Sequence, residues 1–270
     1  MALKLTYTGQ TSIPVEIEGL TPDKVRGQSI SDIERFEIFH ANRKAVLADF
    51  FRVAGDAADG RLELEGDLAG VHWIGAGMAE GEIRIDGNAG RHLGSEMRGG
   101  RIDCHGDAGG WVGAEMQGGL IHIHGSAGHL VGAAYRGSPR GMTKGIILVD
   151  GDVGNELGHT MRRGMIAVGG SCGDMTGFNM IAGNIYVFGS AGIRPGAGMR
   201  RGTIGFFGEE PALLPSFRRG STYEPLYLRL ALLDLRRQGF AVDDQLLGAS
   251  YVNYHGDFIE GGRGEIVVRA

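Results

Sequence analysis

Four polar side chains of types that bind metals or move protons fall in two similar short segments. Asp103 and His105 lie in RIDCH, and His122 and His124 lie in LIHIH. Residues two apart on a β-strand point to the same side, so the paired residues of each segment share a face. Imidazole and carboxylate groups are common zinc ligands, but open strand positions without a pocket are more typical of surface histidines. We therefore predict no metal site in this chain.

Arginine recurs at one place in the sequence pattern, directly after a methionine or a tyrosine. If the segments that carry these arginines stack on one another, their guanidinium groups repel unless an anion lies along them. Solvated turn charges paired with neighbouring carboxylates are the alternative interpretation. We predict a binding stripe for an acidic partner surface or a polyanionic cofactor tail. The stripe comprises Arg98, Arg136, Arg162 and Arg200, with Arg163 and Arg201 next to its last two members.

Motifs of covalent, phosphate or metallopeptidase chemistry are not recognised in the sequence. We identify no nucleophile elbow, Walker loop or HExxH helix. The many GxxG pieces do not open a helix inside a βαβ unit, so we interpret them as chain corners rather than dinucleotide sites. Cys104 and Cys172 lie three repeating units apart and are interpreted as small core residues. We therefore assign no catalytic residue, although an activity of the chain itself is left open.

An internal repeat of about 19 residues must position these side chains. Glycine opens every unit and returns six places later, and apolar residues stand two and four places after the opening glycine, as on a strand with one buried face. A period near 20 residues is typical of solenoids, and parallel crossovers are right-handed. We predict an all-β fold, a right-handed parallel β-helix of about eight coils. The opening glycines are Gly60, Gly81, Gly100, Gly119, Gly145, Gly164, Gly183 and Gly202.

Sixteen places after the opening glycine, the units carry a column of large apolar residues. The longer step before Gly145 is interpreted as an insertion over residues 138–144. Methionine fills irregular corners of a core, so we predict a buried stack; a methionine-lined partner groove is the alternative. The predicted column comprises Met97, Met116, Tyr135, Met161, Met180 and Met199.

The two ends of the chain do not repeat. We predict an N-terminal cap over residues 1–59, the repeats over 60–208, and a C-terminal helix and tail over 209–270. The cap includes a hairpin that turns near Ala41 and Asn42. The helix is expected over residues 224–239, with Leu226, Leu230 and Leu233 on one apolar stripe. The outward strand positions are polar in the early units and apolar in the later ones, so the C-terminal segment or another subunit must cover the later units.

Composition narrows the functional classes further. The net charge of −5 does not favour nucleic-acid binding, and no apolar run approaches the roughly 20 residues of a membrane helix. The segment MALKLTYTGQ lacks the layout of a signal peptide. We expect a cytoplasmic protein that binds neither nucleic acid nor membrane. The predominance of arginine over lysine favours a bacterial source.

The repeated phrase G-x-I-x-I-x-G-D-A-G-x-x-V-G-x-x-M-x-G resembles the C subunit of formylmethanofuran dehydrogenase. It is more distantly similar to the C-terminal glycine-repeat domain of the glutamate synthase large subunit. The resemblance is carried by GRIDCHGDAGGWVGAEMQGG (100–119), LADFFRVAG (47–55), the insertion before Gly145, and NYHGDFIEGGRGEI (253–266).

The resemblance implies a β-helix subunit of a multi-subunit one-carbon enzyme. In archaeal members the complex works at a tungsten or molybdenum pterin. In methylotrophic bacteria a related formyltransferase/hydrolase complex moves a formyl group from tetrahydromethanopterin to methanofuran and releases formate. The implied partners are hydrolase-like, pterin-enzyme-like and formyltransferase subunits, and the catalytic residues lie on them, so no catalytic residue or bound cofactor is carried to this chain.

We therefore expect a non-catalytic structural subunit. The polyanion along the arginine stripe would be an acidic partner surface or the glutamate-rich tail of methanofuran. The outer faces of the fifth to eighth coils and the helix over 224–239 are the expected partner contacts. A free-standing β-helix enzyme of the carbohydrate-lyase type, or a glutamate synthase-like glycine-repeat domain, is the alternative.

Overall fold

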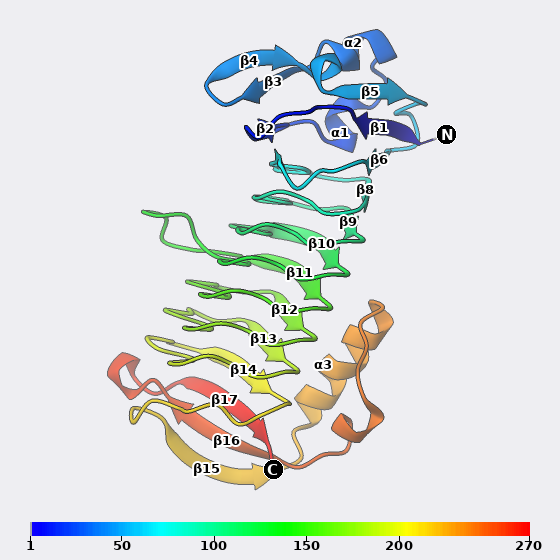
Figure 1. Ribbon diagram of the computed structural model, residues 1–270. Coiled ribbons are helices and arrows are strands. Elements are labelled where there is room, and N and C mark those ends of the chain that lie inside the picture. The colour runs from blue at the N-terminus through cyan, green and yellow to red at the C-terminus, as the bar shows by residue number, and fades with distance from the viewer. Residues whose placement is uncertain (1) are drawn as a thin grey trace.

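A tall stack of parallel strands forms the body of the molecule (Figure 1). The computed structural model describes residues 2–270. Thirteen strands make one sheet, in which eight strands of the repeats follow one another in sequence order. Each of these eight pairs in parallel with the next. They are β6 (Arg61–Glu65), β8 (Glu82–Asp86), β9 (Arg101–Cys104), β10 (Gln117–Ile123), β11 (Lys144–Val149), β12 (Met165–Val168), β13 (Asn184–Val187) and β14 (Gly202–Phe206).

Equivalent residues of successive repeats are direct neighbours, as the sequence predicted. Ile83 pairs with Ile102, and Ile102 pairs with Ile121. All three side chains are buried because they point to the inner face of their strands. A second column of parallel bridges runs through the repeats outside these strands. It joins Leu68, Ala89, Ala108, Ala127, Val153, Cys172 and Ala191 in that order.

Glycine serves two purposes at the corners between these columns. Gly94 has a left-handed backbone with φ of +62°, and a Cβ there would lie 2.4 Å from Cδ1 of Ile121. A Cβ on Gly109 would instead lie 2.9 Å from the backbone of Gly90 and Arg91 in the preceding repeat. Only glycine tolerates both requirements without displacing a neighbour. The repeated glycines therefore set how closely one turn of chain sits on the last.

The methionine column is fully buried, but one of its members differs from the prediction. Met142 lies in the column, and its Cε is 2.7 Å from a Cβ built on Gly164, as that of Met116 is 2.8 Å from one on Gly145. Tyr135 lies in the insertion, which occupies residues 135–141 rather than 138–144. The buried position is filled by the apolar side chain of Met142. Glycine spacing alone did not determine where the seven extra residues lie. The buried column is Met78, Met97, Met116, Met142, Met161, Met180 and Met199.

The N-terminal segment continues the stack beyond β6. β1 (Leu3–Tyr7) pairs in parallel with β6 and antiparallel with β5 (Phe51–Ala54). A separate four-stranded sheet lies beside it. The predicted hairpin is confirmed, because the strands before and after Ala41 and Asn42 pair antiparallel. The remaining elements are β2 (Val15–Glu16), α1 (Pro22–Val25), α2 (Ile30–Glu34), β3 (Glu37–His40), β4 (Arg43–Val46), η1 (Leu47–Asp49) and β7 (Val71–His72).

The C-terminal segment closes the other end of the stack. Its last strand pairs in parallel with β14, and the strand before it returns antiparallel, so the two form a hairpin. Among the described residues no helix is both long and apolar enough for a membrane span. The elements are β15 (Arg218–Tyr223), α3 (Leu226–Arg237), η2 (Asp244–Leu246), β16 (Tyr251–Gly256), η3 (Phe258–Glu260) and β17 (Gly264–Arg269).

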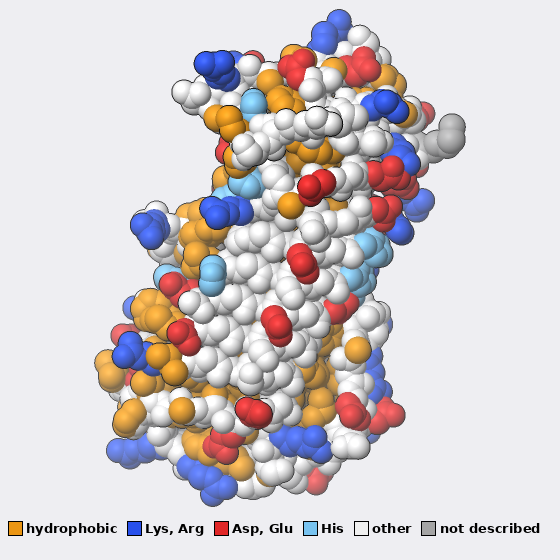
Figure 2. All heavy atoms as spheres, viewed as in Figure 1, with side chains coloured by type: hydrophobic (Ala, Val, Ile, Leu, Met, Phe, Trp, Pro, Cys, Tyr) orange, Lys and Arg blue, Asp and Glu red, His pale blue; other side chains and the backbone are white. Residues whose placement is uncertain are grey.

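Helix α3 covers the apolar outer face of the later repeats (Figure 1). Leu228, Leu232 and Leu235 are buried in one cluster with outward residues of the strands, such as Leu148 and Tyr186. In Figure 2 charged side chains and then histidines border the early strands, and hydrophobic side chains follow toward the C-terminal end. This chain therefore covers with its own helix much of the face that the sequence assigned to a partner.

The apolar stripe predicted for α3 lies on the outer side of the helix, away from the sheet. Leu226, Leu230 and Leu233 point to solvent and are 68%, 59% and 41% exposed. The helix carries leucine on two sides, so its periodicity did not distinguish the side that packs on the sheet. The result is an exposed apolar stripe that includes Tyr227, 42% exposed.

Candidate anion-binding site

Five arginines border one hollow of about 270 Å³ near the C-terminal end of the stack. Ile181 and Ala182, from the repeat between the arginine pairs, form part of its wall. We call this feature the arginine hollow. Its basic residues are Arg162, Arg163, Arg200, Arg201 and Arg263.

The repeat places the first four of these arginines. Each pair directly follows a fully buried methionine, Met161 or Met199. Because the methionine fills the interior, the two residues after it lie at the corner before the next strand. The backbone N–H of Arg162 donates to the carbonyl of Met142 at 2.9 Å, and that of Arg200 donates to Met180 at 2.8 Å. These equivalent contacts fix both corners in the same orientation, two repeats or about 10 Å apart.

The fifth arginine comes from the C-terminal hairpin. Strand β17 occupies the position that a further repeat would take, and Gly264 pairs with Gly202 in parallel register. Arg263 and Arg201 therefore precede neighbouring strands at equivalent positions. The tail in this way adds one more cation to the corner that the repeats have built.

Little negative charge balances this hollow. Arg200 forms an ion pair with Glu260, with 3.2 Å between Nε and a carboxylate oxygen. Within residues 2–270 none of the other four guanidinium groups has a carboxylate at ion-pair distance. Two like charges about 10 Å apart, the separation of the two corners, repel by about 0.4 kcal/mol even in water. An anion with several carboxylates would relieve that repulsion at several arginines together.

The four arginines of the predicted stripe do not border one hollow. Arg162 and Arg200 meet in the arginine hollow, but Arg98 lines another hollow, of about 380 Å³, beside Lys24 and Glu96. Arg136 lies in the insertion, next to a hollow of about 210 Å³. The misplaced insertion is the reason for the error at Arg136. Uncharged Gln117 and Thr143 occupy the equivalent positions between Arg98 and Arg162. Each donates its backbone N–H to the carbonyl of the column methionine in the preceding repeat, Met97 for Gln117 and Met116 for Thr143.

A ladder of aromatic rings lies between those two other hollows. Trp73 stacks on His92 with ring centroids 4.1 Å apart and an angle of 6° between the planes. Trp111 continues the stack at 6.0 Å from His92. Tyr135 from the insertion covers the ladder, with its hydroxyl 2.9 Å from Nδ1 of His92 and donating to Oγ of Ser95 at 2.9 Å. Burial, with smaller effects of neighbouring cations, lowers the pKa of His92 to about 4.

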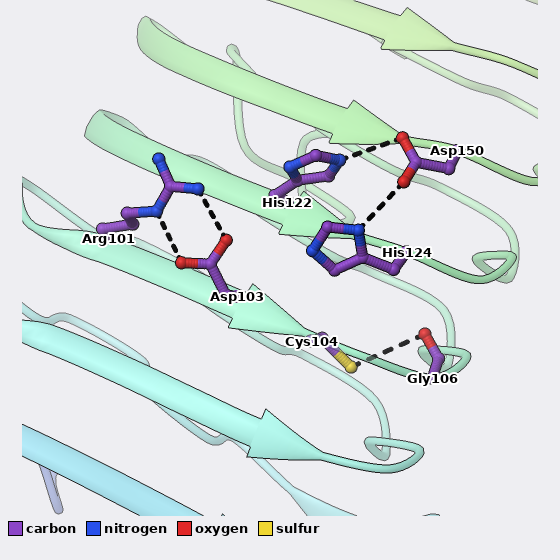
Figure 3. A network of polar contacts seen from close by, with 7 residues as sticks. All are labelled: Arg101, Asp103, Cys104, Gly106, His122, His124 and Asp150. Carbon is purple, nitrogen blue, oxygen red and sulfur yellow. Dashed lines mark hydrogen bonds and ion pairs between the residues drawn. The ribbon is translucent and has the colours of Figure 1, made fainter. Parts of the chain in front are cut away.

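The outer face of β9 and β10 brings together Asp103, His122 and His124, which the sequence had singled out (Figure 3). His122 pairs with Asp103 across the two strands, and the rings of His105 and His124 stack at 4.7 Å. Sequence reasoning missed Asp150, which accepts from Nε2 of His122 at 2.9 Å and from Nδ1 of His124 at 3.0 Å. Its signal was present: Asp150 holds the place in its repeat that His124 holds in the one before.

Each carboxylate of this network has a cationic or polar partner. Asp103 accepts two hydrogen bonds from Arg101, at 2.5 and 2.7 Å. Burial opposes ionisation of Asp103, but Arg101 holds its pKa below the usual value. Burial acts in the same way on Asp150, and the hydrogen bonds from His122 and His124 again keep its pKa low. Both groups are therefore ionised at neutral pH. Cys104 faces the interior, where burial raises the thiol pKa to about 11.

Curated relatives match one part of the chain. The C subunit of a tungsten-containing formylmethanofuran dehydrogenase from Methanothermobacter thermautotrophicus is 36% identical over 94 residues. The C subunit of a molybdenum-containing enzyme of the same organism is 40% identical over 95 residues. The matches cover 33% and 35% of this chain, and the chain spans 35% and 24% of the two relatives. No family model matches the sequence.

A solved structure matches the chain over its whole length. A chain in the crystal structure of the formyltransferase/hydrolase complex (FhcABCD) from Methylorubrum extorquens, in complex with methylofuran, superposes with a TM-score of 0.90. The two are 34% identical, and the match covers 99% of each. The chain belongs to the family of formylmethanofuran dehydrogenase C subunits.

Proposed function

We propose that this member of the C-subunit family is a structural subunit of a formyltransferase/hydrolase-type complex. Such a complex interconverts formyl-tetrahydromethanopterin, formylmethanofuran and formate in one-carbon metabolism. The observation that carries the proposal is the full-length match, at 34% identity, to a chain of the FhcABCD complex. Hydrolase-like, pterin-enzyme-like and formyltransferase subunits are the proposed partners, and the chemistry takes place on them.

For the architecture, we propose a right-handed parallel β-helix over residues 60–208. Residues 1–59 form its N-terminal cap, and residues 209–270 form its C-terminal helix and tail. Two columns of parallel pairing, one through β6 to β14 and one through the bridges from Leu68 to Ala191, support this proposal. A solenoid with a fixed stacking distance is a stiff support on which subunits can be held at a constant separation.

The exposed stripe of α3 is the proposed contact for a partner subunit. Leu226, Tyr227, Leu230 and Leu233 place large apolar side chains in solvent on one helix that is anchored from behind by its buried leucines. Such a patch on a firm support is typical of a protein interface. Of the two partner contacts predicted from the sequence, the outer face of the later repeats is largely covered by α3, whereas the outer side of α3 itself is free to contact a partner.

The arginine hollow is the proposed site for a chain of carboxylates. The proposed ligand is the glutamate-rich tail of a methanofuran-type cofactor, and the competing occupant is an acidic segment of a partner. The relative in FhcABCD was crystallised with methylofuran. The assignment is supported by five arginines around one hollow, of which only Arg200 forms an ion pair with a carboxylate among the described residues. The role proposed for Arg98 and Arg136 within one continuous stripe is not retained, because each borders a different hollow.

Co-purification from the native host tests the proposed function. The chain should be recovered with other subunits, and mass spectrometry of the co-purifying chains should identify a hydrolase-like and a formyltransferase subunit in fixed ratio. A homogeneous free chain that degrades polysaccharide would support the carbohydrate-lyase alternative and overturn the proposal. Gel filtration before and after high salt separates a stable complex from loose association.

A further inference from the structure

We propose that His122, His124 and Asp103 bind a divalent transition-metal ion such as zinc. One candidate ligand atom from each of the three residues lies within 4.8 Å of the others. Two imidazoles and a carboxylate leave a fourth position for water, which is the arrangement of an open zinc site. The sequence alone predicted no metal here, because open strand positions without a pocket are more typical of surface histidines.

Asp150 supplies that orientation. Its two oxygens accept one hydrogen bond from each imidazole, from Nε2 of His122 and from Nδ1 of His124. An ionised carboxylate only accepts, so both protons lie on the Asp150 side and the other ring nitrogens keep their lone pairs. Metal-binding histidines commonly donate their second N–H to a carboxylate in this way. Figure 3 shows the second nitrogen of His124 turned toward the side where Asp103 lies.

The backbone holds the proposed ligands on rigid elements. His122 and Asp103 are register partners on β10 and β9, and His122 is 3% exposed. His124 and Asp150 are open to solvent, so an ion can reach the site without unfolding. Zinc ligands lie about 3.3 Å apart in tetrahedral geometry. The three candidate atoms, within 4.8 Å of one another, therefore need only a small approach to reach that spacing.

Arg101 sets the affinity of the proposed site. It binds both oxygens of Asp103, so a metal ion must share that carboxylate or displace the guanidinium group. The two aspartates and Arg101 together carry one net negative charge, which favours a cation. Glu82, the register partner of Arg101 on β8, is a second carboxylate that acts on the Arg101 charge. Removing Arg101 should therefore raise the metal affinity several-fold.

The test compares the full chain, with any subunits that co-purify, as wild type and as variants. Each sample is saturated with ZnCl₂ and desalted, and zinc per copy of the chain is measured by mass spectrometry. Wild type should hold one zinc more than His124→Ala, and Asp103→Asn should lose the same ion. His105→Ala is the matched control, an exposed histidine of the same ring stack that is not a proposed ligand; it should retain the ion. Zinc held by other subunits is the same in wild type and variants, so it drops out when their zinc contents are subtracted.

Anomalous diffraction locates the ion independently of the counting. Zinc-soaked crystals should give a peak among His122, His124 and Asp103 above the zinc edge and none below it. Asp150→Asn should weaken zinc binding tenfold or more, and Arg101→Gln should strengthen it. The proposal is overturned if wild type, His124→Ala and Asp103→Asn hold equal zinc, or if the soaked wild-type crystals show no peak at these residues.

Discussion

Nε of Arg200 lies 3.2 Å from a carboxylate oxygen of Glu260, although 60 residues separate the two in sequence. Arg200 stands at a corner of the repeats, and Glu260 belongs to η3 in the C-terminal hairpin. The ion pair attaches the tail to the stack and neutralises one of the five cations of the arginine hollow. Because the Arg200 side chain is largely exposed and that of Glu260 is partly exposed, the pair contributes about 1 kcal/mol or less to stability. Its larger effect is on the charge available to a bound anion.

Replacing Arg162 and Arg163 together by glutamine should weaken polyanion binding at least tenfold. The probe is a fluorescently labelled hexaglutamate peptide, titrated by anisotropy into the full chain with its co-purifying subunits. Wild-type binding should also weaken as salt rises, because exposed charge interactions are screened. The variant should lose part of that salt dependence.

Two controls make this result specific to the hollow. Arg43→Gln with Arg52→Gln removes the same charge from the N-terminal segment and should leave the affinity within about twofold. Glu260→Gln frees Arg200 and should strengthen binding. Equal losses of peptide affinity in the two arginine double variants would show that binding depends on net charge and not on the arginine hollow.

Substituting the buried methionines tests where the insertion lies. Met142→Ala and Met161→Ala should each lower the free energy of unfolding by about 2–5 kcal/mol, because each removes a fully buried side chain and leaves a cavity. Met161→Leu keeps most of the volume and should lower it by less than about 1.5 kcal/mol. Urea unfolding followed by circular dichroism measures the differences. A negligible effect of Met142→Ala would contradict its place in the column.

Acid should weaken the aromatic ladder through His92. Its pKa is about 4 in the folded chain and 6.5 in the reference state, so the unfolded chain binds the proton more readily. The stabilising contribution is complete above pH 6.5 and is lost as the pH falls from 6.5 toward 4. Allowing for partial solvent exposure, the loss is on the order of 1–2 kcal/mol. Unfolding free energies at pH 7 and pH 5 measure it.

His92→Asn should flatten this pH dependence. Asparagine tolerates the left-handed backbone of residue 92, with φ of 64°, so the slope with pH can be compared even if the variant is less stable. His72 and Arg91 stay in place as the neighbouring titratable and charged groups. His255→Asn, at an exposed site, shows whether loss of any histidine has the same consequence. An unchanged slope in His92→Asn would remove His92 as the cause.

The two faces of α3 should respond differently to substitution. Leu230→Asp alters the exposed stripe and should change stability by less than about 0.5 kcal/mol, while recovery of partner subunits falls severalfold. Leu232→Ala alters the buried face and should lower the free energy of unfolding by about 2–5 kcal/mol. Thermal unfolding and quantitative co-purification provide the two measurements. Full partner recovery by Leu230→Asp would exclude the stripe as the interface.

The sequence predicts the stacked strands well because two signals agree there. Ile83, Ile102 and Ile121 recur with the glycines that open their units, so periodicity and alternation give one register. No comparable signal places the insertion, because Tyr135 and Met142 are both large enough for the column. The buried side of α3 was equally undetermined, since leucines occur on both sides of the helix.

The arginine hollow could be predicted only in part. The pairs at 162–163 and 200–201 follow the repeat, and their proximity follows from stacking. Arg263 cannot be placed this way, because it comes from a tail that takes a strand position about 60 residues beyond the last unit. Asp150 was within reach of the repeat, but the pattern did not show that it accepts hydrogen bonds from both histidines of the preceding unit. Contacts between unlike residues at equivalent positions require the folded structure.

Strand direction reverses at both ends of the stack, where β5 runs against β1 and β16 runs against β17. A parallel array that stopped abruptly would offer its open edge to another molecule, and copies could then join end to end into filaments. The reversed strands make this a rod of defined length instead. Deleting or duplicating one 19-residue unit should shorten or lengthen that rod by about 4.8 Å, so its reach is set by the number of repeats in the gene.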